Sequence, residues 1–220
     1  MKSFQFTFLL LMIAFTASAQ SSYVQFSTSK GNIVVMLYDQ TPLHRDNFLK
    51  QIKNGTFKDQ EFNRVIKGFV SQGGELDETI LNREKLHPEA PLQRVAAEIM
   101  PGLYHKKGAL GAGRNDNPEK SSYLDQIYFV EGKKYSDTAL EQMEKKTGHS
   151  FSAAERSTYK TIGGTPQLDG DYTIFGEIVK GLQVAESINS VATNASDRPV
   201  SKQVFKLHIL TKDEISKLRK

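Results

Sequence analysis

The 220-residue chain contains no cysteine, so no disulfide can form. This composition is compatible with an oxidising compartment but does not establish one. The five histidines show no HExxH pattern or similar spacing of metal ligands. No serine, histidine and aspartate set of the kind used in nucleophilic catalysis is evident either. We therefore expect neither a metal nor a cofactor.

The chain also lacks an excess of charge of one sign. Lys and Arg number 29 against 25 Asp and Glu, which gives a net charge of +4, and the two signs are interspersed. A nucleic-acid-binding surface would need a basic cluster, so we expect no nucleic-acid partner. With 38% hydrophobic residues, a chain of this length can bury one sizeable core, which predicts a single domain.

The amino terminus has the pattern of a signal peptide over residues 1–19. Lys2 precedes an apolar stretch over residues 6–15, and Ala17-Ser18-Ala19 supplies a small-residue cleavage site. The apolar stretch is too short to span a bilayer comfortably, which disfavours an uncleaved anchor. No cysteine follows the cleavage site, so we expect residues 20–220 to be exported without a lipid anchor or stable membrane insertion. A periplasmic location is favoured over secretion or envelope association.

Local patterns after this segment predict a sheet and one early helix. Residues 23–28 and 31–38 are rich in β-forming residues and flank a short turn, which indicates a hairpin. Thr41-Pro42 is typical of a helix start, and the apolar stripe that follows ends near Asn54-Gly55. Residues 75–91 are polar and contain two X-Pro pairs, which favours a loop, whereas residues 94–98 resemble a strand.

The most informative stretch is residues 62–74, Phe-Asn-Arg-Val-Ile-Lys-Gly-Phe-Val-Ser-Gln-Gly-Gly. Its alternation suits two short strands that break at Gly68, which would bring Arg64, Gln72 and a phenyl ring to one face. Arg stays protonated at any working pH and Gln does not titrate, so this face has no nucleophile and no acid/base pair. It suits binding and polarising a ligand.

This stretch closely resembles the signature of the cyclophilin-type peptidyl-prolyl cis-trans isomerases. A second resemblance lies in residues 168–178, which match the family's Leu-Asp-Gly-x-[His/Tyr]-x-x-Phe-Gly-x-[Val/Ile] block, and a third in the strand-like residues 126–130. The resemblance covers roughly residues 23–210. It implies a mainly β fold: a closed eight-stranded antiparallel barrel with a helix capping each open end, a packed interior, and a ligand groove on the outer wall.

The resemblance also implies the site. Arg64 and Gln72 take catalytic roles, Gln126 faces the substrate, and Gly113 lets the substrate backbone approach closely. The expected substrate-binding residues are Phe62, Phe69, Val70, Gly113, Arg114, Gln126, Tyr128, Leu168 and Tyr172. Two positions depart from the family pattern. Tyr123-Leu124-Asp125 replaces a small Gly-Ser approach, and Gln167 stands where many members carry tryptophan, which puts binding of cyclosporin in doubt.

Residues 133–163 are expected to be an insertion with two helices. Leu140 and Met143 lie on one face of the first, which ends before Gly148, and Ser152 with Glu155 makes a capping-box start for the second. Similar insertions occur in exported bacteroidete-like cyclophilins, which supports that origin. Beyond the second signature block, residues 181–188 predict the second capping helix and residues 204–210 a last strand.

The predicted function is catalysis of rotation about Xaa-Pro bonds in unfolded or flexible exported proteins, by a monomer. The alternative is a peptide-binding chaperone or assembly module without turnover, which the altered Tyr123-Leu124-Asp125 approach supports. A pure binder would not need Arg64, Gln72, Tyr128 and Leu168 together. The glycines of residues 108–113 do not follow the GxGxxG order of a nucleotide-binding loop. Bulky apolar alternation along the strands disfavours a ligand inside the barrel.

Overall fold

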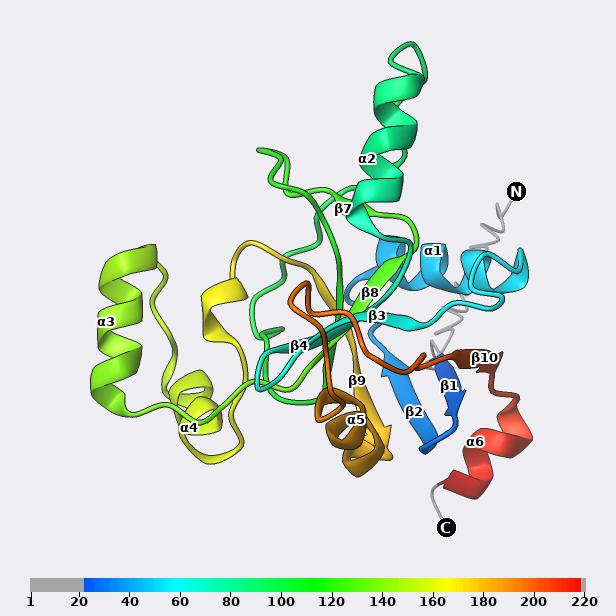
Figure 1. Cartoon of the computed structure of the whole chain (residues 1–220). Coiled ribbons are helices and arrows are strands. Elements are labelled where there is room, and N and C mark those ends of the chain that lie inside the picture. Colours follow the sequence, from blue (N-terminus) through cyan, green and yellow to red (C-terminus); the bar gives the residue numbers. More distant parts are fainter. Residues whose placement is uncertain (1–21, 219–220) are drawn as a thin grey trace, which may run out of the picture.

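The computed structural model describes residues 22–218, so the expected signal peptide lies outside the described residues. Eight strands form one antiparallel sheet in the order β10-β1-β2-β9-β6-β8-β4-β3 (Figure 1). They are β1 (Tyr23–Thr28), β2 (Gly31–Leu37), β3 (Phe62–Ile66), β4 (Val70–Gly74), β6 (Ala109–Ala112), β8 (Gln126–Val130), β9 (Ile174–Lys180) and β10 (Phe205–Ile209). The strands β5 (Arg94–Val95) and β7 (Ser122–Tyr123) pair separately. The predicted eight-stranded antiparallel sheet is confirmed.

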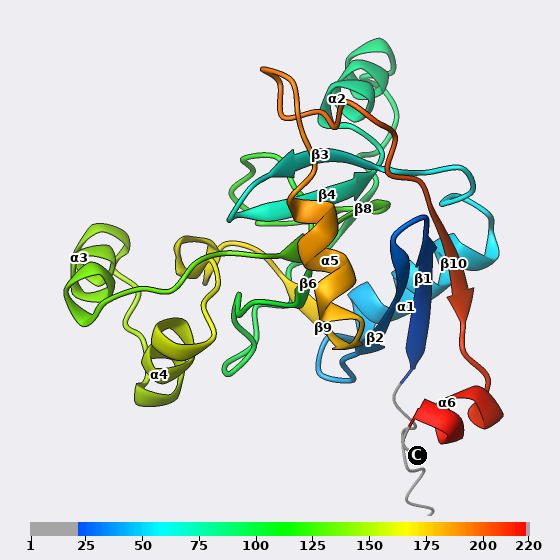
Figure 2. The ribbon, with the colours of Figure 1, turned by 60° about the horizontal axis from the view of Figure 1, so that its bottom comes forward.

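The sheet curls so that its two edge strands, β10 and β3, approach each other (Figure 2). They meet just outside the strands, through a single bridge between Glu61 and Val204. Two backbone hydrogen bonds support this contact, from Phe62 N to Gln203 O at 3.0 Å and from Phe205 N to Gln60 O at 3.2 Å. The architecture is therefore a half-barrel with a narrow seam, and full closure is a slight overstatement of it.

Phenylalanine rings fill the inside of the curled sheet. Ring centroids of neighbouring phenylalanines lie 4.9 to 6.5 Å apart. The interior rings are Phe26, Phe48, Phe57, Phe62, Phe129, Phe175 and Phe205. Complete burial of such a side chain contributes about 1.5 to 3 kcal/mol, so this cluster supplies much of the stability of a chain without disulfides.

Two helices pack into the same interior, as the family resemblance implied. Helix α1 (Pro42–Lys53) contributes Phe48, and α5 (Leu182–Asn189) contributes Val184, Ala185 and Ile188. The amphipathic stripe of each helix therefore faces the barrel interior.

The first turn of α1 is capped by a residue 55 positions away. The Thr41 side chain makes no capping hydrogen bond. Instead, the Glu98 carboxylate accepts from Leu43 N at 3.0 Å and from His44 N at 2.9 Å. The same carboxylate lies 2.7 Å from His44 Nδ1. Burial lowers the pKa of His44 more than Glu98 raises it, so the imidazole stays neutral at neutral pH. Residues 94–98 were expected to form one strand, but strand pairing ends at Val95.

Helix α2 (Asp77–Leu86) corrects the expectation of a loop over residues 75–91. It projects from the body of the protein (Figure 1). Its apolar stripe is reduced to the buried Ile80, which is why the periodicity did not reveal it. Asp77 and Glu78 in its first turn and Arg83 and Lys85 in its last are placed favourably for the helix dipole.

Helices α3 (Asp137–Thr147) and α4 (Ala153–Thr161) lie to one side of the sheet, where two helices were expected, and α6 (Lys212–Leu218) follows the last strand (Figure 1). The capping box of Ser152 and Glu155 is present at the start of α4. Leu140 is fully buried against Phe151 and Tyr159, and Met143 packs at the edge of this cluster. None of the helices between residues 22 and 218 has the length and apolar character needed to cross a membrane.

We predict that Glu98→Ala lowers the free energy of unfolding by about 2 kcal/mol, because two amide groups of α1 lose their acceptor and the helix loses a favourable charge at its N-terminus. Urea denaturation followed by circular dichroism measures this loss. Glu141→Ala, at an exposed position of α3, is the control. Equal effects of the two substitutions would contradict the capping role of Glu98.

Candidate functional site

A β-bulge in β3 decides which side chains of the signature face outward. Phe62 pairs with Gly73 and Arg64 pairs with Gln72, so Asn63 is the extra residue. The bulge places Phe62 inside the curled sheet, beside Val65, while Arg64 points to the outer face. The expectation that Phe62 contacts substrate is therefore wrong. Its ring is fully buried among the interior phenylalanines, on the opposite face from Arg64.

The hairpin that carries the signature is held from both ends. At its turn, the Asn189 side chain at the end of α5 accepts from Gly68 N at 2.8 Å and donates to Ser71 Oγ at 3.0 Å. At its other end, Gly74 has φ of +97°, and a Cβ there would lie 1.9 Å from Asp125 O. Only glycine allows β4 to run this close to β8. Asn189 has no sequence signal that marks it as a partner of this turn.

Cross-strand pairing builds a row of side chains on the outer face. Arg64 pairs with Gln72, Gln72 with Tyr128, and Tyr128 with Gly111, across β3, β4, β8 and β6. Side chains directly opposite each other in adjacent antiparallel strands share one face of the sheet. The structure therefore brings together Arg64, Gln72 and Tyr128, which the sequence placed in one site.

An apolar cluster lies on this outer face beside the row. Val70 and Tyr128 form its base and are each 4% exposed, while Phe69, Leu168 and Tyr172 are half-buried at its margin. The rings of Tyr128 and Tyr172 meet edge to face, with centroids 6.2 Å apart. These are five of the expected substrate-binding residues, and they come from the turn before β4, β4 itself, β8 and the segment before β9. The cluster offers an apolar seat for a small ring.

Two polar groups beside this seat have free hydrogen-bonding capacity. The Arg64 side chain is 44% exposed, and its nearest charged partner among residues 22–218 is Asp197, whose carboxylate lies 3.7 Å from Nη2. That distance is an electrostatic contact rather than a hydrogen bond. Gln72 is 9% exposed, and its side-chain amide makes no hydrogen bond within the described part of the chain. Both groups are therefore available to a ligand.

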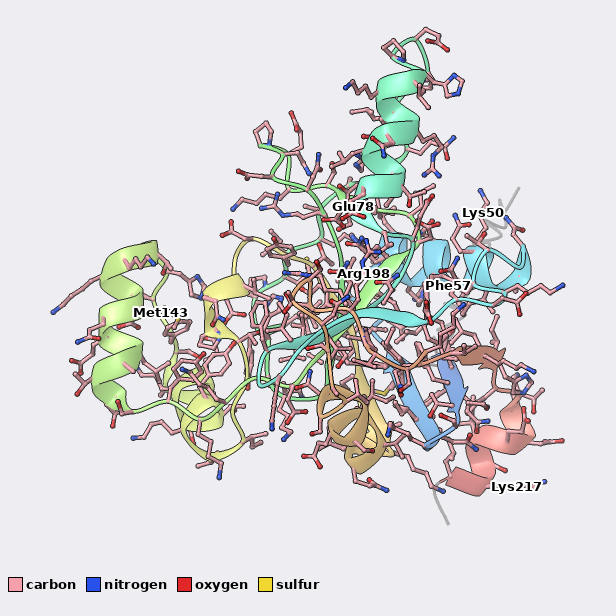
Figure 3. The ribbon with its side chains drawn as sticks, in the orientation of Figure 1. Lys50, Phe57, Glu78, Met143, Arg198 and Lys217 are labelled. Carbon is pink, nitrogen blue, oxygen red and sulfur yellow. The ribbon has the colours of Figure 1, made fainter. Side chains whose placement is uncertain are left out.

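Asp197 is a neighbour of the site that the sequence did not reveal. It has φ of +59° and its carbonyl accepts from Val65 N at 2.8 Å, so its loop lies along the edge of β3. The next residue, Arg198, forms an ion pair at 2.7 Å with Glu78 in the first turn of α2 (Figure 3). Helix α2 thereby helps to position the Asp197 carboxylate. Within residues 22–218, this is the only carboxylate paired with Arg64.

Arg114 lies at the margin of the apolar cluster but is occupied by the protein itself. Its Nε donates to Asp171 O at 2.7 Å and its Nη1 donates to Asn115 O at 2.8 Å. The guanidinium also lies 4.8 Å from the centroid of the Tyr172 ring, a cation–π contact. Arg114 thus fixes Tyr172 at the edge of the seat.

The structure corrects the expected role of Gln126. The Gln126 side chain is 2% exposed, and its amide donates to Glu75 O at 2.9 Å and to the Asp77 carboxylate. It therefore holds the start of α2 and does not face the groove. A Cβ on Gly113 would lie 1.9 Å from Gln126 Oε1, so the glycine leaves room for this carboxamide, and its contact with a substrate backbone stays a prediction.

A separate cleft of about 620 Å³ lies between the end of α1, α2 and residues 90–94. The departing segment Tyr123-Leu124-Asp125 lines this cleft rather than the seat on the outer face. Burial raises the pKa of Asp125 to about 6, and the negative charge of Glu75 acts in the same direction, while Arg83 opposes them. The departure of Tyr123-Leu124-Asp125 from the family pattern therefore affects the lining of this cleft and not the apolar seat.

The fold and this face define a class of protein: a half-barrel whose outer face places an apolar cluster beside a guanidinium and a carboxamide, with no nucleophile among them. The family model for "Cyclophilin type peptidyl-prolyl cis-trans isomerase/CLD" matches residues 23–208. The chain belongs to the family of cyclophilin-type peptidyl-prolyl cis-trans isomerases, and the enzyme class predicted from the signature is confirmed.

Relatives and solved structures agree with this assignment. A Staphylococcus epidermidis protein named "Putative peptidyl-prolyl cis-trans isomerase" is 29% identical over 174 residues, which are 79% of this chain and 83% of that protein. A protein of Streptococcus pyogenes named "Putative bifunctional phosphatase/peptidyl-prolyl cis-trans isomerase" is 31% identical over 184 residues. The matched part is 36% of the length of that protein. A Cryptosporidium parvum cyclophilin has a TM-score of 0.62 at 20% identity, covering 88% of this chain and 99% of that one, which shows the shared fold.

We predict that Asp125 makes stability depend on pH between about 4 and 6. In this window the unfolded chain ionises Asp125 while the folded chain keeps it protonated, so stability falls as the pH rises. Asp125→Asn should therefore gain about 1 to 2 kcal/mol relative to the unsubstituted protein between pH 4 and pH 7, less than the full linkage value because the carboxyl is partly exposed.

Urea unfolding at a series of pH values measures this gain. Asp116→Asn, at an exposed position, is the control and should show no such trend. A difference between Asp125→Asn and the unsubstituted protein that stays constant from pH 4 to pH 7 would contradict the assignment.

Proposed function

We propose that the chain catalyses cis-trans rotation about Xaa-Pro bonds of unfolded or flexible polypeptides on the outer face of β3, β4 and β8. The observation that carries this proposal is the free polar pair, Arg64 and Gln72, beside the apolar cluster of Tyr128, Val70 and Phe69. A prolyl ring has the size and apolar character for that seat. The amide that precedes it would then lie beside the two polar groups.

The reaction breaks no covalent bond. Its barrier of about 18 to 20 kcal/mol comes from amide resonance, which is lost as the C–N bond twists. In the twisted state the prolyl nitrogen regains a lone pair, to which the Arg64 guanidinium donates a hydrogen bond. The planar amide offers no comparable acceptor, so this interaction favours the transition state selectively.

Arg64 supplies part of the acceleration. A charge-assisted hydrogen bond contributes about 1.5 to 3 kcal/mol, which corresponds to a rate gain of about ten- to 150-fold. The partner Asp197 lies too far away to form a hydrogen bond, so the donors of Arg64 remain available at the moment of rotation.

The apolar seat and Gln72 supply the rest. The planar amide has a larger dipole than the twisted amide, so removing water from it on Tyr128 and Phe69 raises the energy of the ground state. The Gln72 amide, fixed opposite Tyr128 in the sheet, would hold the carbonyl on one side of the bond while the prolyl side turns.

We predict that Arg64→Ala lowers kcat/KM by at least tenfold, with the loss mainly in kcat, because the hydrogen bond forms in the transition state. NMR exchange spectroscopy on a set of Xaa-Pro peptides measures the rate. Arg45→Ala, which removes an arginine of α1 paired with Asp39 and Asp46, is the control for lost ion pairs and should keep its activity.

Two results would overturn this proposal. Arg64→Ala with unchanged kcat/KM would remove the guanidinium from the mechanism. An unsubstituted protein that binds the peptides without raising their exchange rate would favour the alternative, a peptide-binding chaperone or assembly module.

We also propose that the enzyme is an exported form, of the bacteroidete-like kind, acting on exported proteins, with the periplasm as its favoured location. The pattern of Lys2, the apolar residues 6–15 and Ala17-Ser18-Ala19 supports this proposal. We predict that the protein recovered from the envelope of its producing cell begins at Gln20, measured by intact mass and amino-terminal sequencing. A recovered chain that retains residues 1–19 would contradict export by cleavage.

A further inference from the structure

A chain of buried hydrogen bonds runs from the apolar seat to helix α4. The Tyr128 hydroxyl lies 2.8 Å from His105 Nε2, and His105 Nδ1 lies 2.7 Å from Asp169 Oδ1. The other oxygen of Asp169 accepts from the Tyr159 hydroxyl. These four side chains, which we call the buried relay, come from β8, the segment before β6, the segment before β9, and α4. The isomerase mechanism above does not use three of them.

Donor and acceptor chemistry sets the directions of the relay for a neutral His105 ring and an ionised Asp169. The Asp169 carboxylate only accepts, so the Nδ1 proton of His105 and the Tyr159 hydroxyl both donate to it. In the neutral imidazole, Nε2 then carries the lone pair, and the Tyr128 hydroxyl donates to it. The His105 backbone N–H also donates to Asp169 Oδ1, at 2.9 Å, which locks the histidine against the carboxylate.

The relay is sealed from water along its length. His105 is 1% exposed, Asp169 8% and Tyr159 not at all. In such surroundings a polar group that loses its partner is costly, so each member depends on the next one for its position.

The Tyr128 ring is confined at its other side as well. A Cβ on the paired residue Gly111 would lie 2.2 Å from Tyr128 Cζ and 2.4 Å from its hydroxyl oxygen. The ring therefore lies directly over the backbone of β6, and glycine is needed there for space. The Tyr128 ring is thus held in place by Gly111 beneath it and by the hydrogen bond between its hydroxyl and His105.

Tyr159 connects the relay to the two helices α3 and α4. It is fully buried in their shared cluster with Leu140 and Phe151, and its carbonyl accepts from Tyr135 N at 3.0 Å. Met143 of α3 packs against the same cluster (Figure 3). Packing within the helical segment thus determines where the Tyr159 hydroxyl sits.

We propose that His105, Asp169 and Tyr159 are positioning residues for prolyl isomerisation, which act by fixing the Tyr128 ring, and that residues 133–163 are coupled to the active site through Tyr159. This inference rests on the function proposed above. The segment expected as an insertion is then part of the catalytic apparatus, since its second helix supplies the last hydroxyl of the relay.

The test is a double-mutant cycle of Tyr159→Phe and Tyr128→Phe. Each single substitution removes one hydroxyl and keeps the ring, and each should lower kcat/KM by about three- to tenfold, the value of one buried hydrogen bond. If Tyr159 acts through Tyr128, Tyr159→Phe should have no further effect on kcat/KM in the Tyr128→Phe background. The kinetics are measured with the same Xaa-Pro peptides.

Tyr104→Phe is the matched control. Its hydroxyl also bonds to α4, at Thr158 Oγ1 with a distance of 2.8 Å, but lies outside the relay. It should lower stability by a similar amount to Tyr159→Phe and leave kcat/KM unchanged. Thermal unfolding of all variants separates loss of stability from loss of positioning.

A readout independent of activity is the ring resonance of Tyr128 in protein with ¹³C-labelled tyrosine. Tyr159→Phe should shift it, and Tyr104→Phe should not. An unshifted resonance, additive effects in the cycle, or equal loss of kcat/KM in Tyr104→Phe would overturn the proposed coupling. If the unsubstituted protein shows no isomerase activity, the function proposal fails, and the ring resonance still decides whether the relay positions Tyr128.

Discussion

Packing of phenylalanines inside the curled sheet determines which side chains lie on its outer face. Strands expose alternate side chains to opposite faces, so the choice of interior rings also chooses the outer residues. Phe129 faces in, and its neighbour Tyr128 therefore faces out. The bulge at Asn63 lets Phe62 and Val65 both reach the interior while Arg64 stays outside. The active face is the complement of the core.

On that face, the sheet and the segments around it position different parts of the site. The sheet fixes the relative positions of Arg64, Gln72 and Tyr128 through two consecutive pairings. Segments outside the strands then restrict each group: Asp197 lies beside the guanidinium, Arg114 holds Tyr172, and His105 receives the Tyr128 hydroxyl. A rotation that breaks no bond depends on such preorganisation, because its catalysis consists of placing dipoles and excluding water.

Much of this arrangement could be predicted from the sequence because the relevant signals are local. Alternation and turn residues predict the strands, Thr41-Pro42 the first helix, and the signature the shared face of Arg64 and Gln72. The misses involve contacts distant in sequence. A single bulge places Phe62 on the inner face, and the cap of α1 comes from Glu98. Gln126 is held at the start of α2, a helix whose one buried residue left too little apolar periodicity to detect.

Intermolecular nuclear Overhauser effects show whether a prolyl ring binds on the outer face beside Arg64. The measurement uses the mature protein with a proline-containing peptide whose cis and trans forms exchange. The account predicts contacts from the prolyl ring protons to the rings of Phe69 and Tyr128, with none to the interior ring of Phe62. Contacts instead to Leu124 and Arg94, which line the cleft beside α2, would place the ligand in the wrong site and contradict the account.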